Sequence, residues 1–396
     1  MQLSQLANGL TPSPTRAFDK LARELAASGK NVLFFTLGEP DFPSPKNVKR
    51  AAITAIKEDF THYTAVAGIP ELRKAIANKF QRDNNLAYSS DQILVSAGAA
   101  NSLYLAFQCL LNPGDEAIVP VPGWSTVFSQ IKTTGAVPVF VQCKEENDFE
   151  VQFEDIQRAI TPKTKLIAIN FPCNPTGAVI PEKTIKQIVE LCREKNLWLI
   201  SDEIYEKITY GQKHVSPALL YENTVTINGA SKAYAMTGWR IGYAAAPVEL
   251  ATAMTSLQGL VLGNPTSISQ KAALEALNGS SSQGSVSKMK KEFRNRRDLI
   301  VKLLNEIPGL HVNIPKGAFY AFANVSGLFG KKTPSAGKTL SNSVDVSSYF
   351  LNEALVATTP GQPFGSDSHV RFSYACSQEQ INEGMTRLKV AVEKLK

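Results

Sequence analysis

Apolar, β-branched runs alternate with amphipathic stretches between about residue 90 and residue 250. One amphipathic stretch is residues 182–196, in which Ile185, Ile188, Val189 and Cys192 recur at the three- and four-residue spacing of a helix face. Strands buried on both faces and separated by helices indicate an α/β fold with a mostly parallel sheet covered by helices. We expect seven strands, at residues 92–97, 116–121, 138–143, 165–170, 197–202, 224–228 and 241–247.

The two ends of the chain have a different pattern. Residues 14–28 and 290–306 each have the spacing of an amphipathic helix, and the Ser/Gly-rich residues 278–285 are predicted as a loop. The mixture predicts a smaller α+β domain that both chain ends build. The expected division is an N-terminal arm with part of the small domain at 1–44, a large domain at 45–289 and a small C-terminal domain at 290–396.

Length, charge and cysteine content narrow the possible classes of protein. A chain of 396 residues exceeds what one core usually organises, which favours two domains. The formal charge is +7, but basic residues are mixed with acidic ones, so we expect neither a nucleic-acid partner nor a membrane partner. The densest basic segment, 288–297, is typical of an exposed helix face. The five cysteines lack the spacing of metal ligands, so we expect no metal. No apolar run is long enough to span a bilayer, and free cysteines suit a reducing compartment, so we expect a cytoplasmic protein.

Three polar residues follow strands of the predicted sheet. Asn174 comes just after the strand at 165–170, Asp202 ends the strand at 197–202, and Lys232 follows the strand at 224–228. Their separations of 28 and 30 residues each match one strand–helix–strand unit. Because ligands bind at the carboxyl ends of the strands in open α/β sheets, these side chains are expected to converge there.

Each of these residues has an ordinary alternative. Asn174 can stabilise the NPTG turn, Asp202 can cap a helix, and Lys232 can be a surface lysine. Together they indicate a specific chemistry. A poorly solvated lysine is a nucleophile towards carbonyl groups, and a carboxylate keeps a pyridine nitrogen protonated, so that the ring accepts electrons. With Arg240 as a phosphate ligand, this set predicts a site for pyridoxal 5′-phosphate.

Other segments fit the same hypothesis. Ala99 and Ala100 are small residues at the expected start of a helix, where backbone amides can bind phosphate. Trp124 lies just past a strand and can stack on the pyridine ring, and Tyr205 can donate a hydrogen bond to the phenolic oxygen of the cofactor. Arg371, in an alternating strand, suits a substrate carboxylate. The alternatives are a common βα turn, a core tryptophan and an edge-strand arginine.

In these residues the sequence resembles the class I/II aminotransferases, which are pyridoxal-phosphate enzymes of the aspartate aminotransferase family and of fold type I. The resemblance covers nearly the whole chain. The segments that carry it occur in the order of the family: LGEPDF (37–42), YTAVAGIPELR (63–73), NPTG (174–177), DEIYE (202–206), SKAYAMTGWRIGY (231–243) and the late Arg371.

The resemblance implies a role for each matching residue. Lys232 is the lysine that binds the cofactor covalently, and Asp202 pairs with the pyridine nitrogen. Asn174 and Tyr205 hold the phenolic oxygen, and Trp124 stacks on the ring. Arg371 binds the substrate α-carboxylate, with Gly38 beside it. The phosphate ligands are Ser231, Arg240, the amides of Ala99 and Ala100, and Tyr63 of a neighbouring subunit, which implies a homodimer.

The resemblance also implies a reaction, the transfer of an amino group from an L-amino acid to a 2-oxo acid in a ping-pong mechanism. A carbon–sulfur β-lyase on the same scaffold, or a ligand-sensing protein without catalysis, remains an alternative. The chain departs from the family at three positions. Gly229 replaces a serine, Ala100 stands where some members that prefer acidic substrates have a lysine, and Gly259 lies near the place of an arginine in others. Neutral amino donors, aliphatic or aromatic, or a broad specificity are therefore expected.

Overall fold

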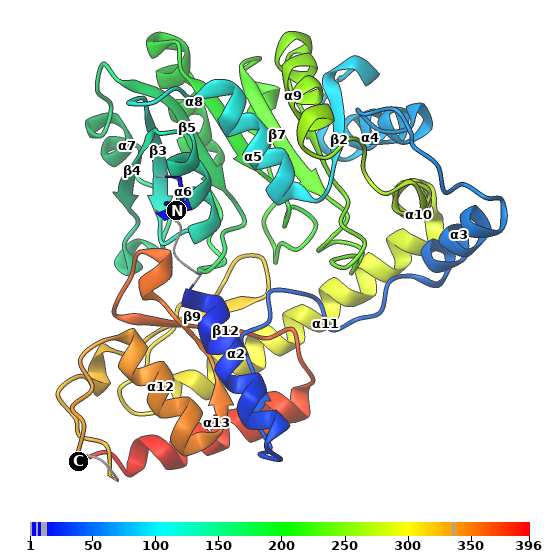
Figure 1. Ribbon diagram of the computed structural model, residues 1–396. Helices are drawn as coiled ribbons and strands as arrows, with labels where there is room; N and C mark the ends of the chain where they lie inside the picture. Colours follow the sequence, from blue (N-terminus) through cyan, green and yellow to red (C-terminus); the bar gives the residue numbers. More distant parts are fainter. Residues whose placement is uncertain (1, 5–6, 9–13, 335–336) are drawn as a thin grey trace.

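The protein is described by a computed structural model that covers residues 2–4, 7–8, 14–334 and 337–396. Figure 1 shows two lobes, and the larger one contains the central sheet. The seven strands of the sheet have the order β2-β8-β7-β6-β5-β3-β4, and every pair is parallel except the two that involve β8. The strands are β2 (Ile93–Ser96), β3 (Glu116–Val121), β4 (Val137–Gln142), β5 (Thr164–Asn170), β6 (Trp198–Asp202), β7 (Thr224–Gly229) and β8 (Gly242–Ala245).

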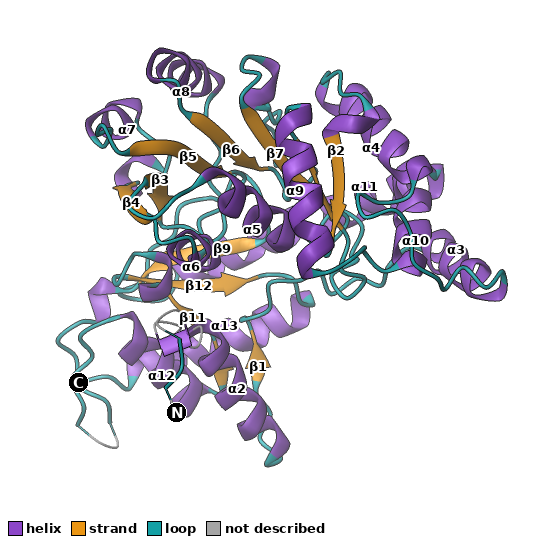
Figure 2. Ribbon diagram, turned by 45° about the horizontal axis from the view of Figure 1, so that its top comes forward, coloured by secondary structure: helices purple, strands orange, loops and turns teal. Residues whose placement is uncertain are grey.

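All seven predicted strands are present, and alternating side chains of β5 show why the central residues of such strands are apolar. Leu166 and Ala168 pack into one buried cluster, whereas Ile167 and Ile169 pack into another. Both faces of the sheet are therefore covered, as Figure 2 also shows. The α-helices of this lobe are α3 (Lys46–Lys57), α4 (Pro70–Asn84), α5 (Ala99–Leu110), α6 (Ser125–Thr133), α7 (Phe153–Arg158), α8 (Glu182–Lys195), α9 (Val248–Val261) and α10 (Ser267–Asn278), of which α3 and α10 pack beside α4 at one edge.

The connection before the antiparallel strand β8 contains no α-helix. Residues 230–241 join β7 to β8 directly, whereas a parallel return is usually made by a helical crossover. At the end of this pair, Gly242 passes close to the start of α5, because a Cβ atom there would lie 2.2 Å from the backbone nitrogen of Ala99. The glycine therefore lets the sheet and the amino end of α5 lie together.

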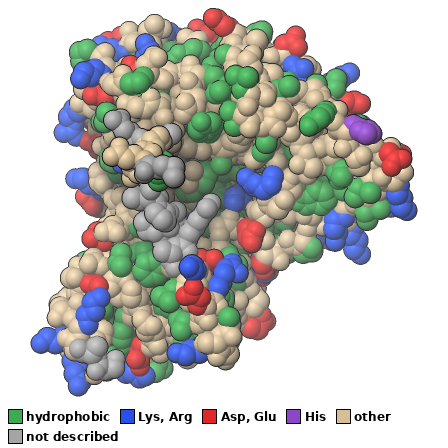
Figure 3. Space-filling view, in the orientation of Figure 1, with side chains coloured by type: hydrophobic (Ala, Val, Ile, Leu, Met, Phe, Trp, Pro, Cys, Tyr) green, Lys and Arg blue, Asp and Glu red, His purple; other side chains and the backbone are tan. Residues whose placement is uncertain are grey.

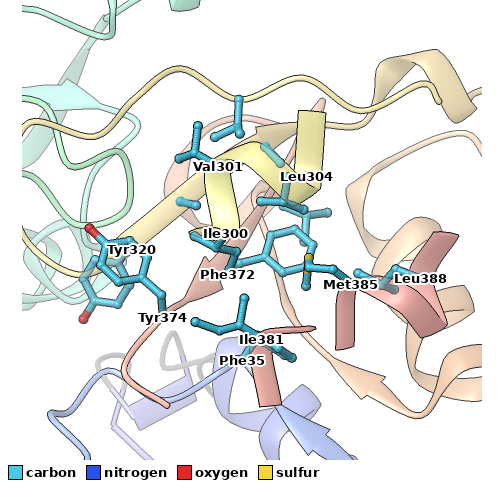
Figure 4. Packing of buried hydrophobic residues seen from close by; sticks show 14 of the residues in the cluster. Phe35, Ile300, Val301, Leu304, Tyr320, Phe372, Tyr374, Ile381, Met385 and Leu388 are labelled. Carbon is cyan, nitrogen blue, oxygen red and sulfur yellow. The ribbon is translucent and has the colours of Figure 1, made fainter. Parts of the chain in front are cut away.

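The smaller lobe combines both chain ends, as the sequence predicted. Its antiparallel sheet has the order β11-β12-β9, and β1 pairs with β10 in parallel. Phe35, from the N-terminal segment, packs with Phe372, Ile381 and Leu388 of the C-terminal part (Figure 4). The elements are α2 (Pro14–Ala27), β1 (Leu33–Phe34), α11 (Ser280–Asn305), β9 (Tyr320–Asn324), α12 (Ser343–Ala354), β10 (Val356–Ala357), β11 (Thr359–Pro360), β12 (His369–Ser373) and α13 (Gln378–Glu393).

The predicted loop at 278–285 is wrong. The helix α10 ends at Asn278 and α11 begins at Ser280, so almost the whole segment is helical. Ser282 is fully buried, and its hydroxyl oxygen accepts a hydrogen bond of 2.8 Å from Asn47 in α3. Tertiary packing of the first turns of α11 overrides the weak helix propensity of serine and glycine. The helix predicted at 290–306 consequently starts earlier and runs from one lobe into the other (Figure 1).

Short 3₁₀ helices complete the described structure, at Ser90–Gln92, Glu145–Asn147, Pro217–Leu219, Ser326–Leu328 and Gln362–Phe364. Within the described part of the chain, none of the helices has both the length and the apolar character that crossing a membrane requires.

Candidate active site

A cavity of about 700 Å³ lies between the two lobes, at the carboxyl ends of β5, β6 and β7. Figure 3 shows the molecule hollowed between its lobes, with basic and acidic side chains at the edge of the hollow. The cavity is lined by residues of both lobes: Asp19, Thr36, Leu37, Gly38, Glu39, Ala99, Ala100, Trp124, Thr126, Asn170, Asn174, Asp202, Ile204, Tyr205, Ser231, Lys232, Thr237, Arg240, Tyr320 and Arg371.

Lys232 lies in the turn that follows β7, and its amine donates a hydrogen bond to the carbonyl oxygen of Gly38. Burial lowers the pKa of Lys232 to about 8, although the negative charge of Glu39 opposes this shift. The positive charges of Arg371 and Arg240 lower the pKa further. A sizeable fraction of this amine is therefore neutral near pH 8, as a nucleophile or proton acceptor must be.

Asp202 ends β6 and is almost completely buried. Burial raises its pKa to about 7, although the backbone N–H of Ile204 donates a hydrogen bond of 3.2 Å to its carboxylate. A neighbouring cation would stabilise the ionised form of this carboxyl group, because the ion pair offsets the free-energy cost of burying the negative charge. The cavity wall thus offers a place for a protonated ring nitrogen.

Arg371 projects from β12 and is buried among neutral groups. Its guanidinium donates hydrogen bonds of 2.9 Å to the side-chain oxygen of Asn174 and of 2.8 Å to the backbone oxygen of Thr36. It also lies 4.6 Å from the ring centroid of Tyr320 and 5.1 Å from that of Phe364. No carboxylate of the described residues lies within 4 Å of it. A buried cation without an ionic partner in the protein marks a binding position for an anion.

A second anion position lies at the start of α5. Gly98 precedes this helix with a φ of 91°, and a Cβ atom on it would come within 2.4 Å of the guanidinium of Arg240. That guanidinium is fixed by hydrogen bonds of 3.0 Å to the oxygen of Thr237 and 3.3 Å to that of Ala97. Arg240, Ser231 and the first amides of α5 together suit a phosphate group.

The remaining predicted residues complete the wall between these positions. Tyr205 and Tyr320 share a hydrogen bond of 2.8 Å between their hydroxyl oxygens, and burial raises the pKa of Tyr205 well above its usual value. The backbone N–H of Asn174 donates a hydrogen bond of 3.2 Å to the side chain of Asn170, which fixes the turn after β5. Trp124 lies just beyond β3 and faces the same space.

Of the predicted site residues, all except Tyr63 line the cavity. The Tyr63 side chain is 95% exposed and lies away from the site of its own chain. Two lining residues were missed that matter for its shape. Asn170 pairs with Asp202 across β5 and β6. It is a polar residue at the end of a strand, so it could have been predicted on the same grounds as Asp202. Tyr320 comes from the other lobe, and no sequence signal indicated it.

The cavity fits pyridoxal phosphate on its own geometry. It combines a lysine amine with a lowered pKa, a buried carboxyl group, a phosphate position at the start of α5, and a buried guanidinium for a further anion. Three of these groups lie at or just after the ends of β6, β7 and β2, and Arg371 comes from the middle of β12 in the other lobe. The fold and the site define a pyridoxal-phosphate enzyme of fold type I.

Comparison with known proteins identifies the family. Residues 30–388 match the model of the family described as aminotransferase class I and II. The chain is 44% identical over 393 residues to a probable aspartate/prephenate aminotransferase of Rhizobium leguminosarum bv. phaseoli, covering 98% of each chain. It is 43% identical over 400 residues to the aspartate aminotransferase of Bacillus subtilis, covering 100% of each. The crystal structure of the aspartate aminotransferase from Rhizobium meliloti matches with a TM-score of 0.95 at 40% identity, covering 100% of each chain.

The chain therefore belongs to the class I and II aminotransferases. It is a pyridoxal-phosphate-dependent transaminase, which transfers an amino group between an amino acid and a 2-oxo acid. The two rival readings of the sequence, a β-lyase and a sensor without catalysis, are not favoured by these relatives.

We expect the purified protein to be yellow and the Lys232→Ala variant to lose covalently bound cofactor. Turnover should fall by at least about a thousandfold, because the resemblance implies that Lys232 binds the cofactor covalently, and loss of that nucleophile removes the covalent step. Absorbance spectra before and after borohydride reduction, together with a transaminase assay, measure both effects. The exposed Lys302→Ala variant is the control. Substantial transaminase activity in Lys232→Ala would contradict the assignment.

Proposed function

We propose that the enzyme binds the α-carboxylate of its substrates at Arg371, moves the α-proton with Lys232, and prefers neutral amino donors. One observation carries the proposal. The buried guanidinium of Arg371 and the amine of Lys232 line the same cavity, and Arg371 has no ionic partner among the described residues.

The other residues are proposed to hold the cofactor. Pyridoxal phosphate, when bound, supplies an aldehyde that reacts with amines and a ring that accepts electrons. Asp202 would keep the ring nitrogen protonated, while Asn174 and Tyr205 would hold the phenolic oxygen and Trp124 would stack on the ring. The proposed phosphate ligands are Ser231, Arg240 and the amides of Ala99 and Ala100, with Gly38 beside the substrate.

Lys232 is well suited to carry a proton between two carbon atoms. Its amine is tethered to the turn after β7, so it can move over a short arc, and its lowered pKa keeps part of it neutral. Proton transfer is most efficient when the pKa of the catalyst lies near the working pH. Lys232 lines the cavity together with residues of both lobes, so the proton would be transferred within the cavity.

The Asp202→Asn variant should still bind the cofactor but lose most of its activity. An amide cannot stabilise a protonated ring nitrogen, and this stabilisation is needed mainly in the transition state. We expect kcat to fall about 100-fold or more, with a smaller change in KM. Steady-state kinetics measure the split, with the exposed Asp91→Asn as control. A kcat close to that of the unmodified enzyme would refute the role.

A homodimer is supported by the apolar surface around Tyr63. The Gln258 side chain donates a hydrogen bond of 2.7 Å to the backbone oxygen of Val66, which joins the segment after Tyr63 to the end of α9. Leu260, at that end, is 87% exposed. Clustered exposed apolar residues indicate a protein contact, and the resemblance implies that Tyr63 reaches the phosphate in the partner subunit.

We expect the protein to sediment as a dimer, and the Leu260→Asp variant to dissociate and lose activity. A buried charge on each side of a symmetric contact is costly. Analytical ultracentrifugation at assay concentration checks the assembly, and the exposed Val390→Asp variant in α13 is the control. A monomer with full activity would show that the site needs no second subunit.

Two further expectations remain proposals. We infer a large domain at 45–289 and a small domain from 1–44 and 290–396. The packing of the N-terminal segment against the C-terminal lobe supports this division. The continuous helix α11 crosses the boundary at 289. We also infer a reducing, cytoplasmic environment, which is supported by the five free cysteines, four of them buried.

The preference for neutral donors rests on the charges of the cavity wall. Its described cations are Lys232, Arg240 and Arg371, and each already has a proposed role. Asp19 and Glu39 also line the cavity and would repel a second carboxylate. Ala100 carries no charge. Gly259 does not line the cavity of its own chain, and a Cβ atom placed on it would lie 3.6 Å from the side chain of Val66.

We expect kcat/KM for aspartate and glutamate to be no better than for alanine, leucine, phenylalanine and methionine. The Ala100→Lys variant should shift the ratio towards the dicarboxylates, because it adds a cation at the position where family members have one. A panel of half-reactions measures the ratios. An advantage for aspartate above about a hundredfold, or roughly 3 kcal/mol of transition-state binding, would show that a distal cation exists.

A further inference from the structure

A buried cluster of charged residues lies directly behind Asp202. Asp202 ends β6 and lines the cavity, whereas Glu203, the next residue in the chain, does not line it. The Glu203 carboxylate is fully buried and accepts hydrogen bonds of 2.9 Å from Ser201 and 2.6 Å from Ser216. Its second oxygen lies 3.0 Å from Nε2 of His214.

The other half of the cluster is an ion pair that is already complete. The ammonium of Lys79, in α4, contacts the carboxylate of Glu206, and both side chains are almost completely buried. Asn84 joins them, since it accepts a hydrogen bond of 2.8 Å from Lys79 and donates one of 2.6 Å to Glu206. Their charges cancel.

The ligand atoms of Glu203, Glu206 and His214 lie within 4.8 Å of one another, which is close enough for a metal ion. A metal ion is nevertheless a poor occupant. The buried Lys79 ammonium already occupies the Glu206 carboxylate and would repel a second cation. The positive charge that neutralises Glu206 is therefore that of Lys79 and not that of a metal ion.

The charge that remains is that of Glu203. The charged groups that face it are Lys79, Glu206 and His214, and the nearby phenols of Tyr88 and Tyr243 are neutral because burial raises their pKa values. Since Lys79 and Glu206 cancel, only a protonated His214 can balance Glu203. The two carboxylates raise the pKa of His214 above its usual value in spite of burial. The charge of Glu203 in turn raises the pKa of Asp202, its neighbour in the chain.

We propose that His214 is a positioning residue that acts through Glu203: as an imidazolium it cancels the Glu203 charge, which leaves Asp202 free to ionise and to pair with the ring nitrogen of the cofactor. His214 touches neither substrate nor cofactor. The inference rests on the role proposed above for Asp202.

The experiment measures the affinity of the apoenzyme for pyridoxal phosphate between pH 5.5 and 9, and so does not depend on turnover. In the unmodified protein, affinity should fall as the pH drops and Asp202 takes up a proton. His214→Gln removes the balancing charge, so the midpoint should move up by about one pH unit, which is a roughly tenfold loss of affinity below the midpoint. Glu203→Gln removes the repelling charge and should move the midpoint down.

The double variant Glu203→Gln/His214→Gln separates charge from structure. If the two side chains act through their charges, the double variant should return to within about twofold of the unmodified affinity. If they only brace the fold, both single variants should weaken binding and the double variant should be at least as weak, which would overturn the inference. The thermal midpoint of each apoenzyme shows whether it is folded, and the exposed His311→Gln is the control.

The Asp202→Asn variant distinguishes the failure of this inference from the failure of the role on which it rests. The pH dependence of binding should flatten in Asp202→Asn, and adding His214→Gln should then have no further effect. If Asp202→Asn keeps the full pH dependence, the role proposed for Asp202 is wrong and this inference falls with it. If the dependence flattens but His214→Gln alone causes no shift, only the present inference is wrong.

Discussion

The burial of the Arg371 guanidinium without an ionic partner among the described residues is the constraint on which the arrangement of the two lobes depends. A buried charge must be satisfied by hydrogen bonds and by the faces of aromatic rings when no carboxylate is near. Arg371 obtains these contacts from Asn174 in the large lobe, from Thr36 in the N-terminal segment and from Tyr320 in the small lobe. The same contacts therefore hold the cavity together and leave a cation facing it.

Burial also accounts for the chemical properties of the two central groups. It lowers the pKa of Lys232 to about 8 and raises that of Asp202 to about 7. Part of the amine and part of the carboxyl group are therefore uncharged between pH 7 and 8. Burial is the largest cause of both shifts, since removal from water disfavours the charged form of each group, and neighbouring charges such as that of Glu203 add to it. The sheet contributes to both shifts because Asp202 ends β6 and Lys232 lies in the turn after β7, where both line the cavity between the two lobes.

Behind this surface the protein contains a second layer of buried charge. Lys79, Glu206, Glu203 and His214 come from α4, from the turn after β6 and from the loop before the 3₁₀ helix Pro217–Leu219. Four buried ionisable groups are expensive to maintain, and a packed apolar core of the same volume would be at least as stable. Glu203 is the neighbour of Asp202 in the chain and connects this cluster to the site, since charges in a poorly solvated interior act on one another across several ångströms.

The sequence by itself determined the seven strands of the sheet and the order of the site residues along the chain. The part of a strand that is buried on both faces is apolar, so a run such as AIVPV at 117–121 favours a buried strand, and residues that follow such strands meet at one edge. Only the tertiary structure decided that residues 280–285 are helical, because the burial of Ser282 against α3 outweighs local propensity. It alone placed Tyr320 against Tyr205 and His214 against Glu203, since contacts between residues that are distant in the chain depend on how the elements pack, and no local pattern records them.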